Sequence, residues 1–280
     1  MRSSTRSPNH SSVLNGTPWP PAAQLCDAAD VTAGQRYDEI GRSYAKTRRE
    51  DPRIASQVRA ALGGARSVVN VGAGSGSYEP ADRVVVAVEP SARMIQQRDG
   101  RPAPVVRGVA EQLPFPDGAF DAALAVLTVH HWSDVGVGLR ELARTARRQV
   151  VLYFEPLHTH RFWALEHFPA ARSLPTEVDP PGERTLREHL DVCEVQRVLV
   201  PHDCGDGFGA AFWGRPEAYL DPQVQAGMSW LAMLTDDERR AGTEALRADL
   251  ASGEWDRRHG HLRTQREYDG GYRLAIATTG

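Results

Sequence analysis

Short apolar runs alternate with helix-like segments between residues 52 and 154, and this alternation constrains the fold more than any other feature of the sequence. Strands are expected at the apolar runs 66–71, 84–89, 104–107, 120–126 and 149–154. Helical patterns occupy 52–62, 91–98 and 134–145, with Asp51 and Ser91 placed to cap two of these helices. Such alternation is typical of a parallel sheet with helices on both faces.

The second half of the chain is expected to complete a Rossmann-like, doubly wound, mostly parallel seven-stranded α/β sheet. Further strands are expected at 194–200 and 271–278, and the stretch between them predicts a helical cap inserted before the last strand. The expected units are a flexible leader or arm (1–34), a cofactor-binding core (35–156), a substrate-side remainder of that core (157–200), the cap (201–268) and the final strand (269–280).

Composition excludes several classes of function. The net charge of -3 over 280 residues gives no overall basic surface, so no nucleic-acid partner is expected. The three cysteines lie far apart, which fits reduced thiols in a cytoplasmic protein better than a disulfide framework. His202, Asp203 and Cys204 lack a recognisable ligand spacing, so we expect no metal. No apolar run is long enough to span a bilayer, so we expect no membrane partner.

A glycine-rich loop follows the first expected strand. Gly72, Gly74 and Gly76 allow the backbone to turn sharply there and bring peptide N–H groups close to a ligand. Glu89 ends the next strand, where a carboxylate can accept hydrogen bonds from both hydroxyls of a ribose. Together these features predict a nucleoside site, without specifying which nucleoside.

Four ordered blocks extend this pattern. They are 69–76 (VNVGAGSG), 86–91 (VAVEPS) with Met94, 110–121 (AEQLPFPDGAFD) and 127–132 (LTVHHW). On these blocks, residues 36 to 156 resemble the small-molecule branch of class I S-adenosylmethionine (SAM)-dependent methyltransferases, which includes enzymes of ubiquinone and menaquinone biosynthesis. The resemblance implies SAM as the cofactor and methyl transfer to a small molecule as the activity.

The resemblance also implies residue roles. Gly72, Gly74 and Gly76 would line the methionine and ribose part of SAM, and Glu89 would hold the ribose diol. The other implied cofactor residues are Pro90 and Met94 beside the adenine ring, Ala110 and Glu111 at its edge, Leu127 near the sulfonium, and Tyr44 and Arg48 at the methionine end.

The sequence departs from the family pattern at three places. Asn70 replaces the usual aspartate near the cofactor's ammonium group, and Val109 replaces an aspartate that commonly meets the adenine amino group. Only Ser77 to Arg83 separate the glycine loop from the next strand, so the helix that normally follows this loop should shrink to a turn.

Candidate catalytic residues follow two strands whose carboxyl ends should face the ligand crevice. His130 and His131 follow 120–126, and Glu155 and His158 follow 149–154. A histidine base would titrate near pH 6.5 and would be needed only for a protonated acceptor; these histidines can equally be structural.

The aromatic residues of the cap favour a flat or apolar acceptor. A nicotinamide-dependent dehydrogenase, a non-catalytic SAM-binding module, and an enzyme that couples methylation to rearrangement or cyclisation of the acceptor remain alternatives. The arm or the cap could also support a homo-oligomer.

Overall fold

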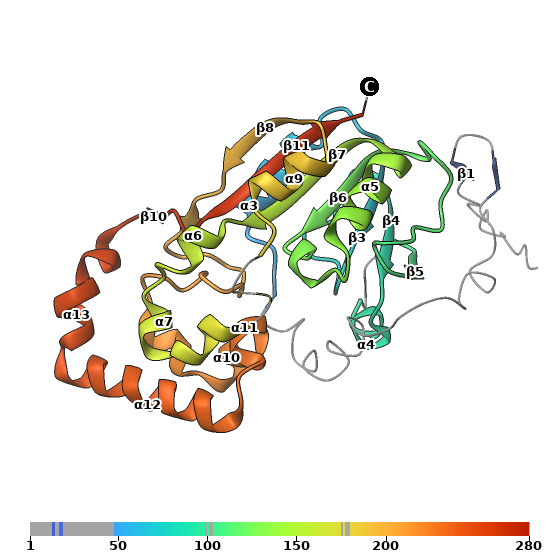
Figure 1. Ribbon diagram of the computed structural model, residues 1–280. Coiled ribbons are helices and arrows are strands. Elements are labelled where there is room, and N and C mark those ends of the chain that lie inside the picture. Colours follow the sequence, from blue (N-terminus) through green and yellow to red (C-terminus); the bar gives the residue numbers. More distant parts are fainter. Residues whose placement is uncertain are drawn as a thin grey trace, which may run out of the picture.

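The computed structural model describes residues 13–14, 17–18, 48–98, 100, 103–174, 176 and 180–279 (Figure 1). Within these ranges, the side chains at 13–14, 17–18, 157 and 159 are not described. The strands β1 (Val13–Leu14) and β2 (Thr17–Pro18) pair with each other in antiparallel fashion. The rest of the expected leader, and the candidate cofactor residue Tyr44, lie outside the described residues.

A seven-stranded sheet forms the centre of the fold, with strand order β5-β4-β3-β6-β7-β11-β8. In chain order its strands are β3 (Ser67–Val71), β4 (Val84–Glu89), β5 (Val105–Arg107), β6 (Phe120–Val126), β7 (Ala146–Phe154), β8 (Val192–Arg197) and β11 (Tyr272–Thr278). The first five strands are parallel, and β11 runs antiparallel between β7 and β8. The expected Rossmann-like, mostly parallel sheet is therefore confirmed.

Two of the expected strands differ from the structure by more than a residue at one end or both. β7 begins at Ala146 rather than at 149, because the preceding helix passes directly into extended backbone at that residue. The expected strand 194–200 is divided: β8 ends at Arg197, and β9 (Val200–Pro201) pairs with β10 (Glu267–Tyr268) outside the main sheet.

Helices cover both faces of the sheet (Figure 1). On one face lies α3 (Pro52–Ala61), whose N-terminus is capped by Asp51 and whose buried Ile54 and Val58 join a core with β3, β6 and β7. On the other face, α5 (Val135–Thr145) and α9 (Glu183–His189) bury Leu139 and Leu186 in a second core. The short α4 (Ala92–Gln96) follows β4, with Ser91 as its cap.

No helix separates Val71 from β4 in the described structure, as the short connection predicts; the chain forms turns there. After β7, the short helices α6 (Pro156–Thr159), α7 (Ala164–His167) and η4 (Pro169–Ser173) lead away from the sheet. Within the described ranges, no helix is both long and apolar enough to cross a membrane.

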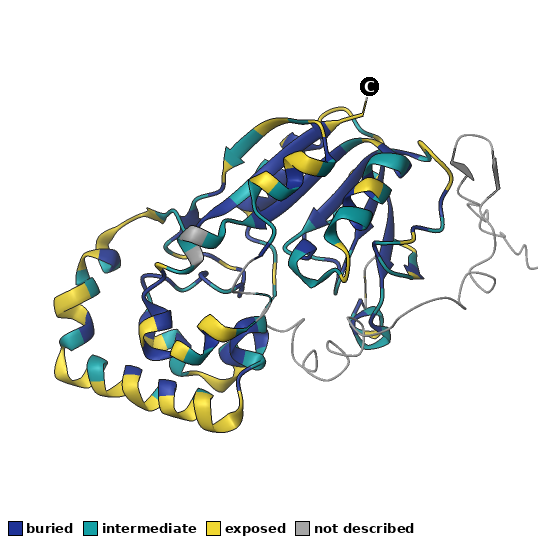
Figure 2. Cartoon of the chain, in the orientation of Figure 1, coloured by how far each residue is buried: buried dark blue, intermediate teal, exposed yellow. Residues whose placement is uncertain are grey.

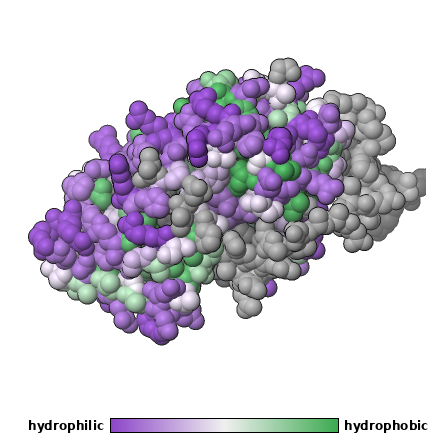
Figure 3. Space-filling view, in the orientation of Figure 1, coloured by the Kyte–Doolittle hydropathy of each residue, from purple (hydrophilic) through white to green (hydrophobic). Residues whose placement is uncertain are grey.

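The chain between β9 and β10 forms the expected helical insertion. Its helices are η5 (Pro216–Leu220), α10 (Pro222–Gly227), α11 (Ser229–Ala232), α12 (Asp236–Ser252), α13 (Glu254–His259) and η6 (Gly260–Thr264). The outer surfaces of α12 and α13 are exposed, whereas β3, β4, β6, β7 and β11 are mostly buried and the edge strand β8 is half-buried or exposed (Figure 2). Most side chains visible on this face of the described chain are hydrophilic, with apolar ones in small groups (Figure 3).

Candidate active site

The glycine loop begins where β3 ends. Gly72, Gly74 and Gly76 have φ angles of 67°, 53° and 89°, a region that side chains disfavour. A Cβ atom at Gly72 would lie 2.0 Å from the Thr128 hydroxyl oxygen, so this position has no room for a side chain. The loop therefore brings bare backbone next to the ends of β4 and β6.

Glu89, the last residue of β4, is held against this loop. Its Oε2 accepts a 2.8 Å hydrogen bond from the Gly74 N–H, and its Oε1 accepts a 2.9 Å bond from the Ser91 N–H. The side chain is buried, but it lines a cavity, and a carboxylate has about four lone-pair sites. Glu89 can therefore hold the loop and still accept hydrogen bonds from a ribose.

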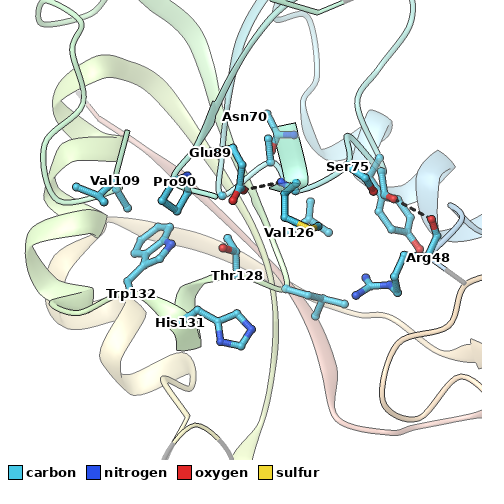
Figure 4. Close-up of a pocket in the computed structure, with 18 of the residues that line it drawn as sticks. Arg48, Asn70, Ser75, Glu89, Pro90, Val109, Val126, Thr128, His131 and Trp132 are labelled. Carbon is cyan, nitrogen blue, oxygen red and sulfur yellow. Dashed lines mark hydrogen bonds between the residues drawn. The ribbon is translucent and has the colours of Figure 1, made fainter. Parts of the chain in front are cut away.

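The cavity around Glu89, hereafter the cofactor cavity, encloses about 920 Å³, part of it open to solvent. Val109, Pro90 and Trp132 lie at one end, Glu89 near the middle and Arg48 at the other end (Figure 4). An elongated ligand with a flat ring, a ribose and a charged tail would fit this arrangement.

Most of the expected cofactor residues line this cavity. Those that do are Arg48, Asn70, Gly72, Gly74, Glu89, Pro90, Met94, Ala110, Glu111 and Leu127. Gly76 does not line the cavity. Its N–H donates to the Ala73 carbonyl and closes the turn, so Gly76 lies behind the residues that form the cavity wall. The expectation that all three glycines line the cofactor is corrected for this residue.

The Asn70 side chain contacts an ion pair that the sequence did not indicate. Its side-chain amide donates to Glu79 Oε1 at 3.0 Å, and Glu79 also pairs with Arg98 at 2.8 Å. Arg98 also donates to the Gly74 carbonyl at 3.3 Å and so supports the loop from behind. An aspartate at 70 would place a second carboxylate beside Glu79, which is electrostatically unfavourable.

The end of the cofactor cavity that Val109, Pro90 and Trp132 form is apolar except at its rim. Trp132 packs on α5, where a Cβ atom at Gly138 would lie 2.4 Å from the indole ring. Glu111 accepts hydrogen bonds from the Ser133 N–H and hydroxyl at 2.7 and 2.8 Å, so it fixes the rim beside Val109. Trp132 is the last residue of the fourth sequence block, 127–132. Its place in that block could have identified it as a residue of the cofactor site.

Arg48 occupies the other end and is not a solvated surface charge. Its Nε donates to Asp206 Oδ1 at 2.7 Å, and the Asp206 side chain is fully buried. The Tyr78 hydroxyl also donates to Asp206, at 2.8 Å. Burial and the nearby Asp206 charge raise the pKa of Tyr78 well above its usual range, so its hydroxyl stays protonated.

A second cavity, hereafter the acceptor cavity, adjoins the first and encloses about 750 Å³, part of it open to solvent. The two cavities share the lining residues Arg48, Leu127 and His131. Leu127 has a φ of 49°, which is strained for a non-glycine residue, and its N–H donates to the Leu152 carbonyl at 2.7 Å. This strained residue therefore forms part of the wall where the two cavities meet.

Aromatic and other apolar side chains dominate the acceptor cavity. The complete lining is Arg48, Leu127, His130, His131, Phe154, Phe162, Leu165, Ala171, Phe208, Gly209, Ala210, Gly227, Met228, Ser229, Trp230, Gly270 and Tyr272. Residues of the insertion thus contribute to this cavity, as does Phe162 from the segment after β7. Trp163 and Trp213 do not line it; Trp213 is fully buried and stacks on Tyr268 with ring centroids 5.2 Å apart.

The two histidines of the fourth block differ in position. His131 lies at the junction of the cavities, whereas His130 lines only the acceptor cavity. The His130 ring lies 3.8 Å from the ring of His131 and 4.8 Å from that of Phe154, measured between centroids. Although its cavity-facing surface is accessible, His130 lies deep in the molecule, and desolvation lowers its pKa to about 3. The expected titration near pH 6.5 therefore does not apply to His130.

Glu155 and His158 line neither cavity, contrary to their expected position at the mouth of the crevice. Glu155 Oε1 accepts the Glu183 N–H at 3.0 Å at the start of α9. Its own N–H donates to the Gly271 carbonyl, and the chain turns into α6 at the next residue. His158 contacts Arg273 at 3.4 Å. The geometry thus favours structural contacts for both residues.

No candidate metal site is found among the described residues. These ranges contain no group of three or more histidine, cysteine, aspartate or glutamate side chains that could hold a metal ion. Asp203 instead pairs with Arg53 at 2.7 Å, and Cys204 is buried.

Comparison with known proteins identifies the fold and the family. A family described as a methyltransferase domain matches residues 69–154. The crystal structure of a protein from Anabaena variabilis, described as a methyltransferase from an antibiotic biosynthesis pathway, superposes with a TM-score of 0.76 at 34% identity and covers 83% of this chain and 99% of that one. The chain belongs to the class I SAM-dependent methyltransferases. SAM is the cofactor of this family.

Curated relatives of this methyltransferase match over less than a third of the chain. The demethylmenaquinone methyltransferase of Mycolicibacterium vanbaalenii is 39% identical over 87 residues, which are 31% of this chain and 35% of that protein. The uncharacterized protein YafE of Escherichia coli is 40% identical over 88 residues, covering 31% of this chain and 39% of that protein. The chain thus aligns with little more than a third of the length of these relatives.

Proposed function

We propose that this protein transfers the methyl group of SAM to a small apolar acceptor bound in the acceptor cavity. The observation that carries the proposal is the junction of the two cavities at Arg48, Leu127 and His131. A ligand that fills one cavity can meet a ligand in the other only at this place. When bound, SAM supplies an electrophilic methyl group on its sulfonium.

Along the cofactor cavity, the lining residues follow the order of the adenine, ribose and methionine parts of SAM. Trp132, Pro90 and Met94 provide apolar surfaces for an adenine ring, and Glu89 can accept hydrogen bonds from the ribose hydroxyls. Gly72 and Gly74 line the cavity with backbone that carries no side chain. With the ribose held by Glu89 in the middle, the methionine end would extend toward Leu127 and Arg48.

Methyl transfer from a sulfonium is an in-line displacement, so holding the two reactants in line can supply most of the catalysis. Leu127 and the aromatic wall would exclude water from the junction, and His130 and His131 would orient the acceptor. Because the acceptor wall is rich in aromatic residues, we favour a neutral or weakly polar ring compound over a polar metabolite. The pathway assigned to the Anabaena protein agrees with a natural-product-like acceptor.

The test uses a variant that fills only the acceptor cavity. A Cβ atom at Gly209 would lie 3.0 Å from Trp230 Nε1, so Gly209→Val should narrow this cavity without touching Glu89. The control is Gly64→Val, because a Cβ atom there meets nothing within 4 Å. With a panel of ring-hydroxylated acceptors, native protein and control should release S-adenosylhomocysteine, whereas Gly209→Val should bind it normally but lose turnover. Equal turnover in all three proteins, or none in the native protein with any acceptor, would refute the proposal.

A further inference from the structure

A buried ion pair lies directly behind the glycine loop. Arg98 Nη2 lies 2.8 Å from Glu79 Oε1 and 2.9 Å from Glu79 Oε2, and both side chains are only 5% exposed. Neither residue lines the cofactor cavity or the acceptor cavity. A buried ion pair adds little net stability compared with apolar side chains of similar volume, because both charges lose their hydration. Stability alone therefore does not account for the pair.

Arg98 holds one residue of the cofactor cavity, Gly74. Its Nη1 donates to the Gly74 carbonyl at 3.3 Å, while the Gly74 N–H donates to Glu89 Oε2 at 2.8 Å. Glycine has the widest choice of backbone conformations, and Gly74 has a φ of 53°. The two hydrogen bonds therefore fix a flexible residue at both its N–H and its carbonyl, next to the carboxylate expected to hold the ribose.

Glu79 holds a second residue of the same cavity, Asn70. The Asn70 Nδ2 donates to Glu79 Oε1 at 3.0 Å. Because a carboxylate only accepts hydrogen bonds, this contact fixes which end of the amide faces Glu79, and the Asn70 oxygen points away from the ion pair. One ion pair thus sets the orientation of two residues, Asn70 and Gly74, that line the cofactor cavity.

We propose that Arg98 and Glu79 are positioning residues of the cofactor site, which hold Gly74 and Asn70 in the orientation that binds SAM. The inference rests on the proposed function only in taking the cofactor cavity as the place where SAM binds. A site that is ordered before its ligand arrives loses less conformational entropy on binding. Loosening the ion pair should therefore weaken cofactor binding even where the fold is unchanged.

The test begins with Arg98→Lys. This variant keeps the positive charge but loses the planar fork that serves Glu79 and Gly74 together. In calorimetry, the Kd for S-adenosylhomocysteine should rise about 3- to 30-fold. In the ligand-free protein, the Gly74 amide should exchange its hydrogen faster than in native protein, because the loop opens more often.

The matched control is Arg83→Lys. Arg83 is also mostly buried, and it donates to two backbone carbonyls at 3.0 and 3.2 Å. It lines neither cavity, so this control should keep the native Kd and the native exchange rate of Gly74.

A second variant separates positioning from stability. Glu79→Gln combined with Arg98→Met replaces the ion pair with neutral side chains, so urea unfolding should show near-native stability. Its Kd for S-adenosylhomocysteine should still rise about 3- to 30-fold, because the Gly74 carbonyl has lost its donor. An ion pair that served stability alone would leave the affinity of this folded variant unchanged.

Native affinity in both variants would overturn the inference, and so would an equal loss of affinity in Arg83→Lys. Failure of both variants to fold would make the pair structural, with the same consequence. If Glu89→Ala leaves affinity for S-adenosylhomocysteine unchanged, the cofactor cavity is not the SAM site and the proposed function fails. If Glu89→Ala weakens binding but Arg98→Lys does not, the positioning role fails alone.

Discussion

The Tyr78 hydroxyl donates a 2.8 Å hydrogen bond to the buried carboxylate of Asp206, 128 residues further along the chain. Tyr78 belongs to the turn that follows the glycine loop, and Asp206 to the insertion that helps to build the acceptor cavity. Arg48 joins the same carboxylate and lines both cavities. This contact therefore ties the two halves of the site into one unit.

Removing the Tyr78 hydroxyl tests this link. Tyr78→Phe leaves a buried carboxylate with one donor fewer, so the free energy of unfolding should fall by about 1–3 kcal/mol. The control is Tyr268→Phe, since the Tyr268 hydroxyl makes no hydrogen bond to a described residue and its loss should change stability far less. Urea unfolding of the three proteins gives the comparison. Equal stabilities would show that the contact does not join the two segments.

Glu89 should be essential for cofactor affinity. Glu89→Ala removes the acceptor for the ribose hydroxyls and also two bonds that hold Gly74 and Ser91. A hydrogen bond to a charged group contributes about 1.5–3 kcal/mol, so the Kd for S-adenosylhomocysteine should rise at least about tenfold. Glu244→Ala on the exposed side of α12 is the control. Unchanged affinity of Glu89→Ala in calorimetry would remove Glu89 from the cofactor site.

Asn70→Asp should destabilise the fold in a pH-dependent way. The new carboxylate would face Glu79, and the like charge would raise its folded-state pKa above the unfolded value of about 3.9. The variant should therefore be less stable than native protein at pH 8 and recover toward native stability as the pH falls and the carboxyl becomes protonated. Unfolding curves at pH 8 and pH 5 test this. A constant difference between the two pH values would mean that Glu79 does not sense residue 70.

His130 should make the native protein sensitive to acid. Its pKa is lowered to about 3 in the fold, first by desolvation and then by the Arg48 charge, whereas the unfolded chain should titrate near 6.5. Between these values the unfolded state binds the extra proton, so stability falls as the pH decreases from about 6.5 toward 3, by at most about 1.4 kcal/mol per pH unit. His130→Asn should lack this component. If the two proteins lose stability in parallel between pH 6.5 and 4, the imidazole is not held neutral.

The same pKa shift changes the expected rate profile. Because His130 is already neutral at pH 6, methyl transfer should not rise through an apparent pKa near 6.5 on its account. Single-turnover rates of native protein and His130→Asn between pH 5.5 and 8 would show this. A rise near pH 6.5 that disappears in the variant would restore His130 as a base of ordinary pKa.

Local signals in the sequence were sufficient for the sheet and for the centre of the cofactor cavity. Apart from the exposed Val84, the β-branched runs at 67–71 and 84–89 are buried on both faces, and a parallel sheet brings their carboxyl ends together, which places Gly72 beside Glu89. Asp51 and Ser91 cap the expected helices for the same reason, since an N-cap involves only a few neighbouring residues. These features do not depend on distant parts of the chain.

The contacts that the sequence could not indicate join residues without a common pattern. Asp206 is one acidic residue among many, and nothing near it in the chain shows that it will pair with Arg48. Trp213 and Trp230 are equally apolar, yet the first stacks on Tyr268 beside the β9–β10 pair and only the second reaches the acceptor cavity. Which aromatic residue becomes core and which becomes pocket depends on tertiary packing.

The most direct test is a crystal structure with S-adenosylhomocysteine and a ring-hydroxylated acceptor such as 2-naphthol bound together. We expect the adenine against Trp132, the ribose hydroxyls on Glu89, and the sulfur beside Leu127 at the junction. The naphthol should lie in the acceptor cavity, with its hydroxyl turned toward that sulfur. Density that places the sulfur away from Leu127, or the naphthol outside the acceptor cavity, would contradict the claim that methyl transfer occurs where these two cavities meet.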